Sequence, residues 1–327
     1  MRVLVTSKSF GRTAPAAIDL LKSSGIDMVR GSKPSMTAAD IAAEIAGFDA
    51  LIVGNDTVDA DVMAAGRALR LIHMHGTGLD AIDVEAATAR GILVSNAPGA
   101  NRNAVAELTV GLILVAARSI DRHIDILKAG KWERTAGHEV SGKTIGMLGL
   151  GQIGRRIVEL MSGFGVRVVA YDVAPDRGWA TDRGVTLVDD ADAVFAAADY
   201  LVLAMPLSAA TRKFVDGRRI GLMKPSAVLI NTARGGLVDD AALCTAVREK
   251  RIAGAALDVF DPEPLPLDSP LRSAGLTLTP HLAATSIETA AEVSMIVARN
   301  VVDVLVHGRF DSAVNPQALT NRSGAVR

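Results

Sequence analysis

The sequence predicts an α/β protein built from two doubly wound parallel-sheet domains. Short aliphatic or β-branched runs alternate with alanine-rich helical stretches, turn residues separate the two, and a second series of the same kind begins near residue 143. Continuous apolar runs of strand length are typical of parallel strands covered by helices on both faces. The length of 327 residues fits two domains at about 150 residues each.

The first series predicts one small doubly wound, flavodoxin-like domain. Its strand-length runs are separated by helical stretches, of which 37–46 is an example. The five runs are 2–6, 26–30, 50–54, 70–74 and 92–95.

A turn cluster at 96–99 precedes a helical segment at 101–117, whose apolar face continues through Leu127. We interpret this segment as the crossing between domains. The last helical segment, 287–306, is long enough to return to the first domain.

The second series predicts a Rossmann sheet of six strands, which suits a dinucleotide-binding domain. Its runs are 144–148, 167–171, 200–204, 227–231, 254–259 and 276–279. We therefore expect residues 1–98 plus 286–327 to form one domain and residues 99–285 the other. The polar end, 315–327, is expected to be a loosely held tail.

Composition and charge exclude several functional classes. A net charge of −1 gives no electrostatic attraction for nucleic acid or anionic membranes, so the partner is expected to be a small molecule. The single Cys244 offers neither a disulfide framework nor a Cys/His cluster, and we expect no metal. The N-terminal apolar run is too short for a signal peptide, and no run is long enough to span a membrane. These features predict a cytoplasmic location.

A glycine motif opens the second series, with the spacing that cradles a pyrophosphate. Gly149, Gly151 and Gly154 follow a strand-length run and begin a helical stretch. The first glycine would allow a tight turn, the second a close approach of the pyrophosphate, and the third close packing of helix on strand. Asp172 ends the next run, where its carboxylate can accept hydrogen bonds from ribose hydroxyls and repel a 2′-phosphate.

No arginine follows Asp172 at positions 173–175, so NAD is favoured over NADP. The alternative is a glycine turn and a capping aspartate without any ligand.

Three chemically active side chains each follow a strand of the second series. Arg234 can clamp a carboxylate, Glu263 lies between two prolines, and His281 follows the last run. Because parallel strands present their carboxyl ends at one edge, the three could meet. A histidine oriented by a carboxylate is what hydride transfer to a ketone requires, since the alkoxide must receive a proton. Taken singly, each could equally be a surface charge or a helix cap.

Together these segments resemble the D-isomer-specific 2-hydroxyacid dehydrogenase family, most closely its 3-phosphoglycerate dehydrogenase branch. The resemblance covers about residues 40–306. Its motifs are HGTGLD at 75–80, NAP at 96–98, AE at 106–107, GLGQIG at 149–154, MPL at 205–207, NTARGG at 231–236, ALDVF at 256–260 and PHL at 280–282.

The resemblance implies a role for each matching residue. Arg234 would bind the substrate carboxylate, His281 would be the acid/base and Glu263 its partner. The substrate loop would comprise His75, Gly76 and Thr77. Cofactor contacts would come from Val105, Gly149, Gly151, Gln152, Ile153, Gly154, Asp172, Pro206, Thr211, Thr232, Asp258 and Ala283. A homodimer joined through the NAD-binding domain is also implied.

The chain departs from the branch where phosphoglycerate-handling relatives carry phosphate-binding arginines. Gly54 and Met74 occupy those positions, so we expect an unphosphorylated substrate unless Arg102 or another cation substitutes. Within these 327 residues we expect the catalytic core without a regulatory domain.

The leading hypothesis is an NAD-dependent oxidoreductase that interconverts a small 2-oxo acid and its D-2-hydroxy acid. The alternative within the same class is 3-phosphoglycerate dehydrogenase. A different class, an NADH-responsive binding protein, shares such folds, because fold alone does not determine function.

Overall fold

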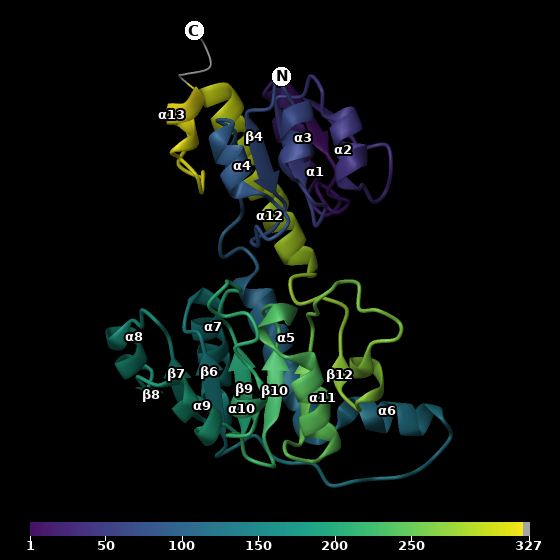
Figure 1. Cartoon of the computed structure of the whole chain (residues 1–327), viewed down its shortest axis with the longest axis vertical. Coiled ribbons are helices and arrows are strands. Elements are labelled where there is room, and N and C mark those ends of the chain that lie inside the picture. The colour runs from purple at the N-terminus through teal and green to yellow at the C-terminus, as the bar shows by residue number, and fades with distance from the viewer. Residues whose placement is uncertain (323–327) are drawn as a thin grey trace. The chain divides into compact units, whose positions relative to one another are not determined.

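The computed structural model describes residues 1–322 and divides the chain into two compact units (Figure 1). Unit 1 comprises 1–101 and the chain from Thr285 onward, and unit 2 comprises 102–284. All strand pairs in both sheets are parallel, which confirms the predicted α/β class.

Unit 1 is a five-stranded sheet, over the described residues, in the order β2-β1-β3-β4-β5, which is the flavodoxin-like order. Its strands are β1 (Arg2–Val5), β2 (Asp27–Arg30), β3 (Ala50–Val53), β4 (Leu71–Met74) and β5 (Leu93–Ser95). Its helices are α1 (Pro15–Ser23), α2 (Ala38–Glu44), α3 (Ala60–Ala65), α4 (Val84–Ala89), α12 (Ile287–Val302) and α13 (Ala318–Arg322). A π-helical turn, Asp303–His307, continues α12.

The core of unit 1 joins the two ends of its discontinuous chain. Every residue of β3 and β4 is buried, as expected for strands covered on both faces. Helix α12 packs on α1, and its Val293, Val297 and Val301 enter the same apolar cluster as Leu21. The C-terminal helix thus completes the fold that the N-terminal strands begin.

Unit 2 is a seven-stranded sheet in the order β12-β11-β10-β9-β6-β7-β8, a Rossmann order with one added strand. Its strands are β6 (Thr144–Leu148), β7 (Arg167–Tyr171), β8 (Val185–Leu187), β9 (Tyr200–Leu203), β10 (Val228–Asn231), β11 (Gly254–Leu257) and β12 (Thr277–Leu278). Its helices are α5 (Arg102–Arg118), α6 (Ile120–Lys128), α7 (Gln152–Met161), α8 (Arg177–Asp182), α9 (Ala191–Ala197), α10 (Gly217–Ile220) and α11 (Asp240–Arg248).

The prediction of six strands in this sheet was wrong by one. Strand β8 is only three residues long, and its sequence, Val-Thr-Leu, is too short to show a periodic pattern. Its pairing with β7 makes it a strand, which is a tertiary contact.

Aspartates begin six helices of the two units, α3, α4, α8, α9, α10 and α11. The side chains of Asp59, Asp83, Asp176, Asp190, Asp216 and Asp239 each accept a hydrogen bond from a backbone N–H in the first turn of the helix that follows. A carboxylate at this position satisfies an otherwise unpaired donor and is favoured by the helix dipole. The aspartate caps therefore define the residue at which each of these helices begins.

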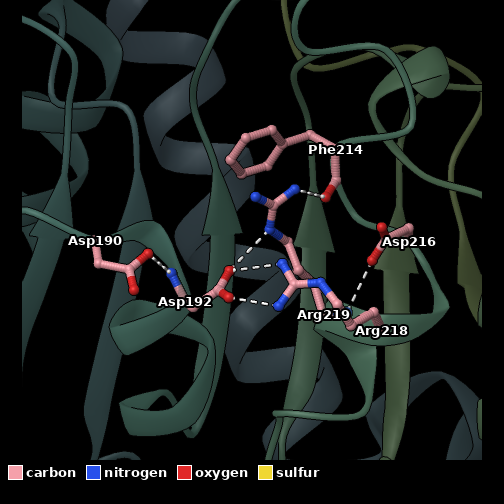
Figure 2. Close-up of polar contacts among 6 residues, drawn as sticks. All are labelled: Asp190, Asp192, Phe214, Asp216, Arg218 and Arg219. Atoms are coloured by element: carbon pink, nitrogen blue, oxygen red, sulfur yellow. Dashed lines mark hydrogen bonds and ion pairs between the residues drawn. The ribbon is translucent and has the colours of Figure 1, made fainter.

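An ion-pair cluster ties α9 to α10 on the surface of unit 2 (Figure 2). The carboxylate of Asp192 accepts hydrogen bonds from Arg218 Nη1 at 2.5 Å and from Arg219 Nε at 3.0 Å. Hydrogen bonds from Arg218 and then Arg219 lower the pKa of Asp192 to about 2. The guanidinium of Arg219 also lies 3.8 Å from the ring centre of Phe214.

Helix α5 is a core helix of unit 2, since its inward-facing residues such as Leu112 and Ile113 are buried in one apolar cluster. Among the described residues, no single helix is both long and apolar enough to cross a membrane. Helices α5 and α6, which are bent by 64° at the break between them, are long and apolar enough only when they are counted together. This comparison considers length and composition alone.

The polar end of the chain is anchored, contrary to the expectation of a loose tail from residue 315. Asn315 is completely buried. Its Oδ1 accepts a hydrogen bond from the N–H of Val94 at 2.7 Å, and its Nδ2 donates to the carbonyl of Ile92 at 3.0 Å and to Thr88 Oγ1 at 2.9 Å. The side-chain amide of Asn315 therefore hydrogen bonds to the backbone along the outer edge of β5. The remainder of that prediction, 323–327, lies outside the described residues.

We expect Asn315→Ala to lower the free energy of unfolding by about 2 to 4 kcal/mol, because it leaves a buried N–H and a buried carbonyl without partners. Urea unfolding followed by circular dichroism measures this change. The matched control is Asn321→Ala, since Asn321 donates one exposed hydrogen bond to Thr88 and should cost less than about 1 kcal/mol. Equal effects of the two substitutions would show that Asn315 does not anchor the chain end.

Candidate functional site

The glycine turn between β6 and α7 has the shape that a pyrophosphate requires. Gly149 has a φ of +98°, and a Cβ there would lie 2.5 Å from the carbonyl oxygen of Ala204. A Cβ on Gly154 would lie 2.5 Å from the carbonyl oxygen of Gly149. Gly151, the N-cap of α7, faces open space instead. Two glycines are thus required by packing, and the third leaves room beside the first amides of the helix, Gln152 and Ile153.

Asp172 follows β7 and is held rigidly beside this turn. Its Oδ2 accepts a hydrogen bond from the N–H of Leu150 at 2.6 Å, and its Oδ1 accepts one from the N–H of Ala174 at 2.9 Å. A carboxylate has about four acceptor positions, so two remain for other donors. The glycine turn and Asp172 therefore fit the phosphates and ribose of a dinucleotide.

A pocket of about 220 Å³ opens next to Asp172. The loop after β7, the first residue of α8 and the end of β8 surround it; the lining residues are Tyr171, Asp172, Val173, Pro175, Arg177, Leu187, Val188 and Asp189. Its volume suits one part of a larger ligand rather than a whole one. Arg177 lies just beyond positions 173–175, where the sequence has no arginine.

The other predicted cofactor residues lie in the same unit, around the carboxyl ends of its strands. Thr211 Oγ1 donates to the carbonyl of Pro206 at 2.8 Å, which closes the loop after β9. The hydroxyls of Thr232 and Thr109 are hydrogen bonded at 2.7 Å, and Thr109 also donates to the carbonyl of Val105. These contacts join α5 to the loop after β10.

The buried carboxylate of Asp258 organises the segment after β12. Asp258 is fully buried and accepts three hydrogen bonds: from Thr279 Oγ1 at 2.6 Å and from the N–H groups of Leu282 and Ala283 at 2.9 Å. Its carbonyl accepts the N–H of His281 at 2.8 Å. His281 itself has a φ of +51°, which a non-glycine residue adopts only when its surroundings impose it. The sequence suggested only a cofactor contact for Asp258, whereas its carboxylate is engaged by this segment.

His281 and Glu263 meet directly. His281 Nδ1 lies 2.6 Å from Glu263 Oε2, and the other carboxylate oxygen accepts the N–H of Phe260 at 2.9 Å. Because Glu263 accepts at Nδ1, the opposite nitrogen, Nε2, is left to exchange a proton with a ligand. The histidine side chain is 40% exposed, so a ligand can reach it.

Arg234 belongs to the same edge of the sheet. It follows β10, Glu263 follows β11 and His281 follows β12, and these three strands are neighbours. The buried Asn231 braces the arginine loop: its Nδ2 donates to the carbonyl of Arg234 and its Oδ1 accepts the N–H of Ala233. Arg234 Nη1 donates to the carbonyl of Ala233 at 2.7 Å. The arrangement combines an anion-binding group with a histidine that can transfer a proton.

In unit 1, the loop 75–77 follows β4 and is tied to the turn at 96–101. The carbonyl of Gly76 accepts the N–H of Ala97, and the carbonyl and hydroxyl of Thr77 accept hydrogen bonds from Asn96 Nδ2 and Asn101 Nδ2 respectively. The nearby positions 54 and 74 carry no positive charge. Over residues 1–322, no group of three or more His, Cys, Asp or Glu side chains is placed to hold a metal ion.

His73 lies in β4 and His75 is the first residue of this loop. Burial keeps both imidazole rings uncharged at neutral pH. His73 Nδ1 donates to the carbonyl of Met74, and its Nε2 accepts from Asn300 Nδ2 at 3.0 Å. His75 Nε2 donates to Ser294 Oγ, whose own proton goes to the carbonyl of Ala290. The pKa of each histidine is lowered to about 4. Burial is the main cause for both, and the charge of Arg30 contributes to the lowering for His75.

The depressed pKa of the fully buried His73 makes the stability of unit 1 depend on pH. Between pH 6.5 and pH 4 the unfolded chain binds a proton there that the folded chain does not, so stability falls as the pH falls through this range. The contribution of this one site is about 3 kcal/mol.

We expect His73→Gln to reduce the loss of unfolding free energy between pH 7 and pH 4.5, measured by urea unfolding at each pH. The exposed His307→Gln should retain the wild-type loss. A pH dependence unchanged by His73→Gln would contradict the assignment of this loss to His73.

Comparison with known proteins agrees with this geometry. The family model for the D-isomer specific 2-hydroxyacid dehydrogenase, NAD binding domain, matches residues 110–283. A D-3-phosphoglycerate dehydrogenase from Methanocaldococcus jannaschii is 41% identical over 284 residues, which are 86% of this chain and 54% of that protein. The chain therefore spans about half the length of that curated relative.

Two further proteins are similar over four fifths or more of their own length. A glyoxylate reductase from Thermofilum pendens is 39% identical over 82% of this chain and 81% of its own. The solved NADPH-dependent glyoxylate/hydroxypyruvate reductase of Sinorhizobium meliloti is 31% identical with a TM-score of 0.83, covering 96% of this chain and 98% of its own. These matches confirm the resemblance seen in the motifs, and the chain belongs to the D-isomer specific 2-hydroxyacid dehydrogenase family, whose members bind a nicotinamide cofactor.

Proposed function

We propose that this protein is an NAD-dependent oxidoreductase that interconverts a small 2-oxo acid and its D-2-hydroxy acid. The observation that carries the proposal is the 2.6 Å contact between His281 and Glu263 at the strand edge that also presents Arg234. A proton donor and a carboxylate-binding cation are the two groups that reduction of a 2-oxo acid needs from the protein.

Each of the three residues has a distinct task. The guanidinium of Arg234 binds the substrate carboxylate through paired N–H groups. Nε2 of His281 protonates the carbonyl oxygen during reduction and removes the hydroxyl proton in the reverse direction. Glu263 orients the ring through Nδ1 and stabilises its protonated form. When bound, the nicotinamide supplies or accepts the hydride.

The cofactor is held by the glycine turn and Asp172. The first amides of α7, at Gln152 and Ile153, would bind the pyrophosphate, and Asp172 would accept hydrogen bonds from the adenosine ribose. A carboxylate fixed by two backbone N–H groups repels a phosphate on the 2′ position, which supports NAD over NADP. Val105, Pro206, Thr211, Thr232, Asp258 and Ala283 complete the proposed cofactor contacts. We also propose a cytoplasmic location, which the single cysteine supports because it offers no disulfide framework of the kind found in oxidising compartments.

The substrate is proposed to be unphosphorylated, with His75, Gly76 and Thr77 of unit 1 as further substrate-binding residues. The neutral His75, the buried Met74 and Gly54 offer no charge to a phosphate dianion there. The similarity to D-3-phosphoglycerate dehydrogenase favours the alternative, a phosphorylated 2-hydroxy acid. The similarity to a glyoxylate reductase favours a smaller substrate.

We also propose that the protein is a homodimer joined through unit 2. Helix α6 extends away from the sheet of this unit (Figure 1). Its Ile120, Ile124 and Leu127, spaced four and three residues apart, are exposed, and the following Trp132 is 83% exposed. An apolar stripe of this kind is stabilised when a second copy covers it.

Loss of NADH absorbance against a panel of 2-oxo acids tests the activity. We expect glyoxylate, pyruvate or hydroxypyruvate to be reduced in preference to 3-phosphohydroxypyruvate. His281→Ala should lower kcat by about 10²- to 10⁴-fold, because the alkoxide loses its proton donor.

In the same variant the Kd for NADH, from fluorescence titration, should stay within about threefold of wild type, since Nε2 acts on the substrate. The exposed His307→Ala serves as the control. Undiminished turnover of His281→Ala would contradict its role, and efficient use of the phosphorylated acid would overturn the proposed substrate. NADH binding without turnover of any acid in the panel would favour a binding protein.

Light scattering after size exclusion tests the dimer. We expect Leu127→Glu to shift the mass from about 68 kDa towards the 34.0 kDa of one chain, because a charge in a covered apolar face is costly. Lys128→Glu, exposed on the same helix, should remain dimeric. A wild-type protein that elutes as a monomer would contradict the proposal.

A further inference from the structure

The pocket beside Asp172 contains a cation that the cofactor preference for NAD does not require. Arg177, the first residue of α8, lines the pocket together with Asp172. An arginine at this position is the type of side chain that binds a phosphate on the adenosine ribose. The pocket therefore holds both the group that repels such a phosphate and a group that could bind it.

In the structure, the guanidinium of Arg177 forms an ion pair with the carboxylate of Asp189. Arg177 Nη2 lies 3.3 Å from Asp189 Oδ1, and the two side chains are 71% and 95% exposed. An ion pair this exposed is weak, because water screens it and both side chains lose freedom to make it. The guanidinium can thus exchange Asp189 for a more highly charged partner at little cost.

Arg155, an arginine of α7 beside the glycine turn, is held by three contacts within the protein. Its Nε donates to the carbonyl of Leu150 at 3.0 Å, its Nη1 pairs with Asp176, and its guanidinium lies 5.3 Å from the ring centre of Trp179. Moving it would break three contacts at once. Arg177 is therefore the arginine of this region best able to meet a ligand.

We propose that Arg177 is a second cofactor-specificity residue: a phosphate-binding cation whose use is blocked by the carboxylates of Asp172 and Asp189. Discrimination against NADP then depends on repulsion by Asp172 and on the competing charge of Asp189, not on the lack of a cation. This inference rests on the proposed function, because it takes Asp172 as the ribose-binding residue. It predicts that removing one carboxylate changes the cofactor preference.

Fluorescence titration with NADH and NADPH tests the proposal by binding alone. We expect Asp172→Ala to lower the Kd for NADPH by at least about tenfold, as charge repulsion is replaced by a charge-assisted hydrogen bond. Asp172→Ala/Arg177→Gln should lose most of that gain. The matched control is Asp172→Ala/Arg183→Gln, since Arg183 follows the other end of α8 and does not line the pocket. The gain should also shrink at high salt.

Asp172 accepts two backbone N–H groups, so its removal could disturb the turn, and a second comparison avoids that risk. Asp189→Asn leaves Asp172 intact and should lower the Kd for NADPH about two- to fivefold, a gain that Asp189→Asn/Arg177→Gln should abolish.

The proposal is overturned if NADPH binds as tightly to Asp172→Ala/Arg177→Gln as to Asp172→Ala, or if neither Asp172→Ala nor Asp189→Asn gains affinity for NADPH. Failure of the proposed cofactor site gives a different result, namely a wild-type protein that does not bind NADH, and failure of the proposed reaction gives NADH binding without turnover of any acid.

Discussion

The buried carboxylate of Asp258 is the interaction on which the candidate site depends. It lies at the end of β11 and satisfies two backbone N–H groups and one hydroxyl of the segment after β12. A buried charge is tolerated only when its hydrogen-bonding capacity is filled, and here the segment that follows β12 supplies the donors. The same segment carries His281 in a left-handed conformation towards Glu263. The pair of His281 and Glu263 is thus held in place by a carboxylate that is itself out of reach of water.

The two units use parallel sheets in the same way but with different chemistry at the strand ends. In unit 2 the loops after β6, β7 and β10 to β12 carry charged side chains and a glycine turn with open space beside it. In unit 1 the loop after β4 carries a histidine kept neutral by burial and hydrogen-bonded hydroxyls. Neutral donors and acceptors suit a small polar substrate, whereas charged groups suit proton transfer and anion binding.

Local sequence predicted the features that depend on neighbouring residues. The glycine turn at 149–154 needs one strand and one helix in sequence, and both are read from a few residues around it. Most strands were found within one or two residues, because parallel strands buried on both faces are continuous apolar runs. Arg234, Glu263 and His281 were predicted as site residues because each follows such a run, and the motifs around them resemble one family.

Tertiary structure decided what depends on partners far away in the chain. Strand β8 exists because it pairs with β7, and Asn315 is buried because it completes β5 from 221 residues away. The pKa of His75 is lowered because folding buries its ring and brings Arg30 near it. Arg177 lines the pocket beside Asp172 because α8 and the end of β8 lie next to the loop after β7. Sequence by itself therefore determined the fold class, the family and the chemical groups of the site. Only the three-dimensional structure decided the burial, protonation and pairing of those groups, because these depend on neighbours brought together by folding.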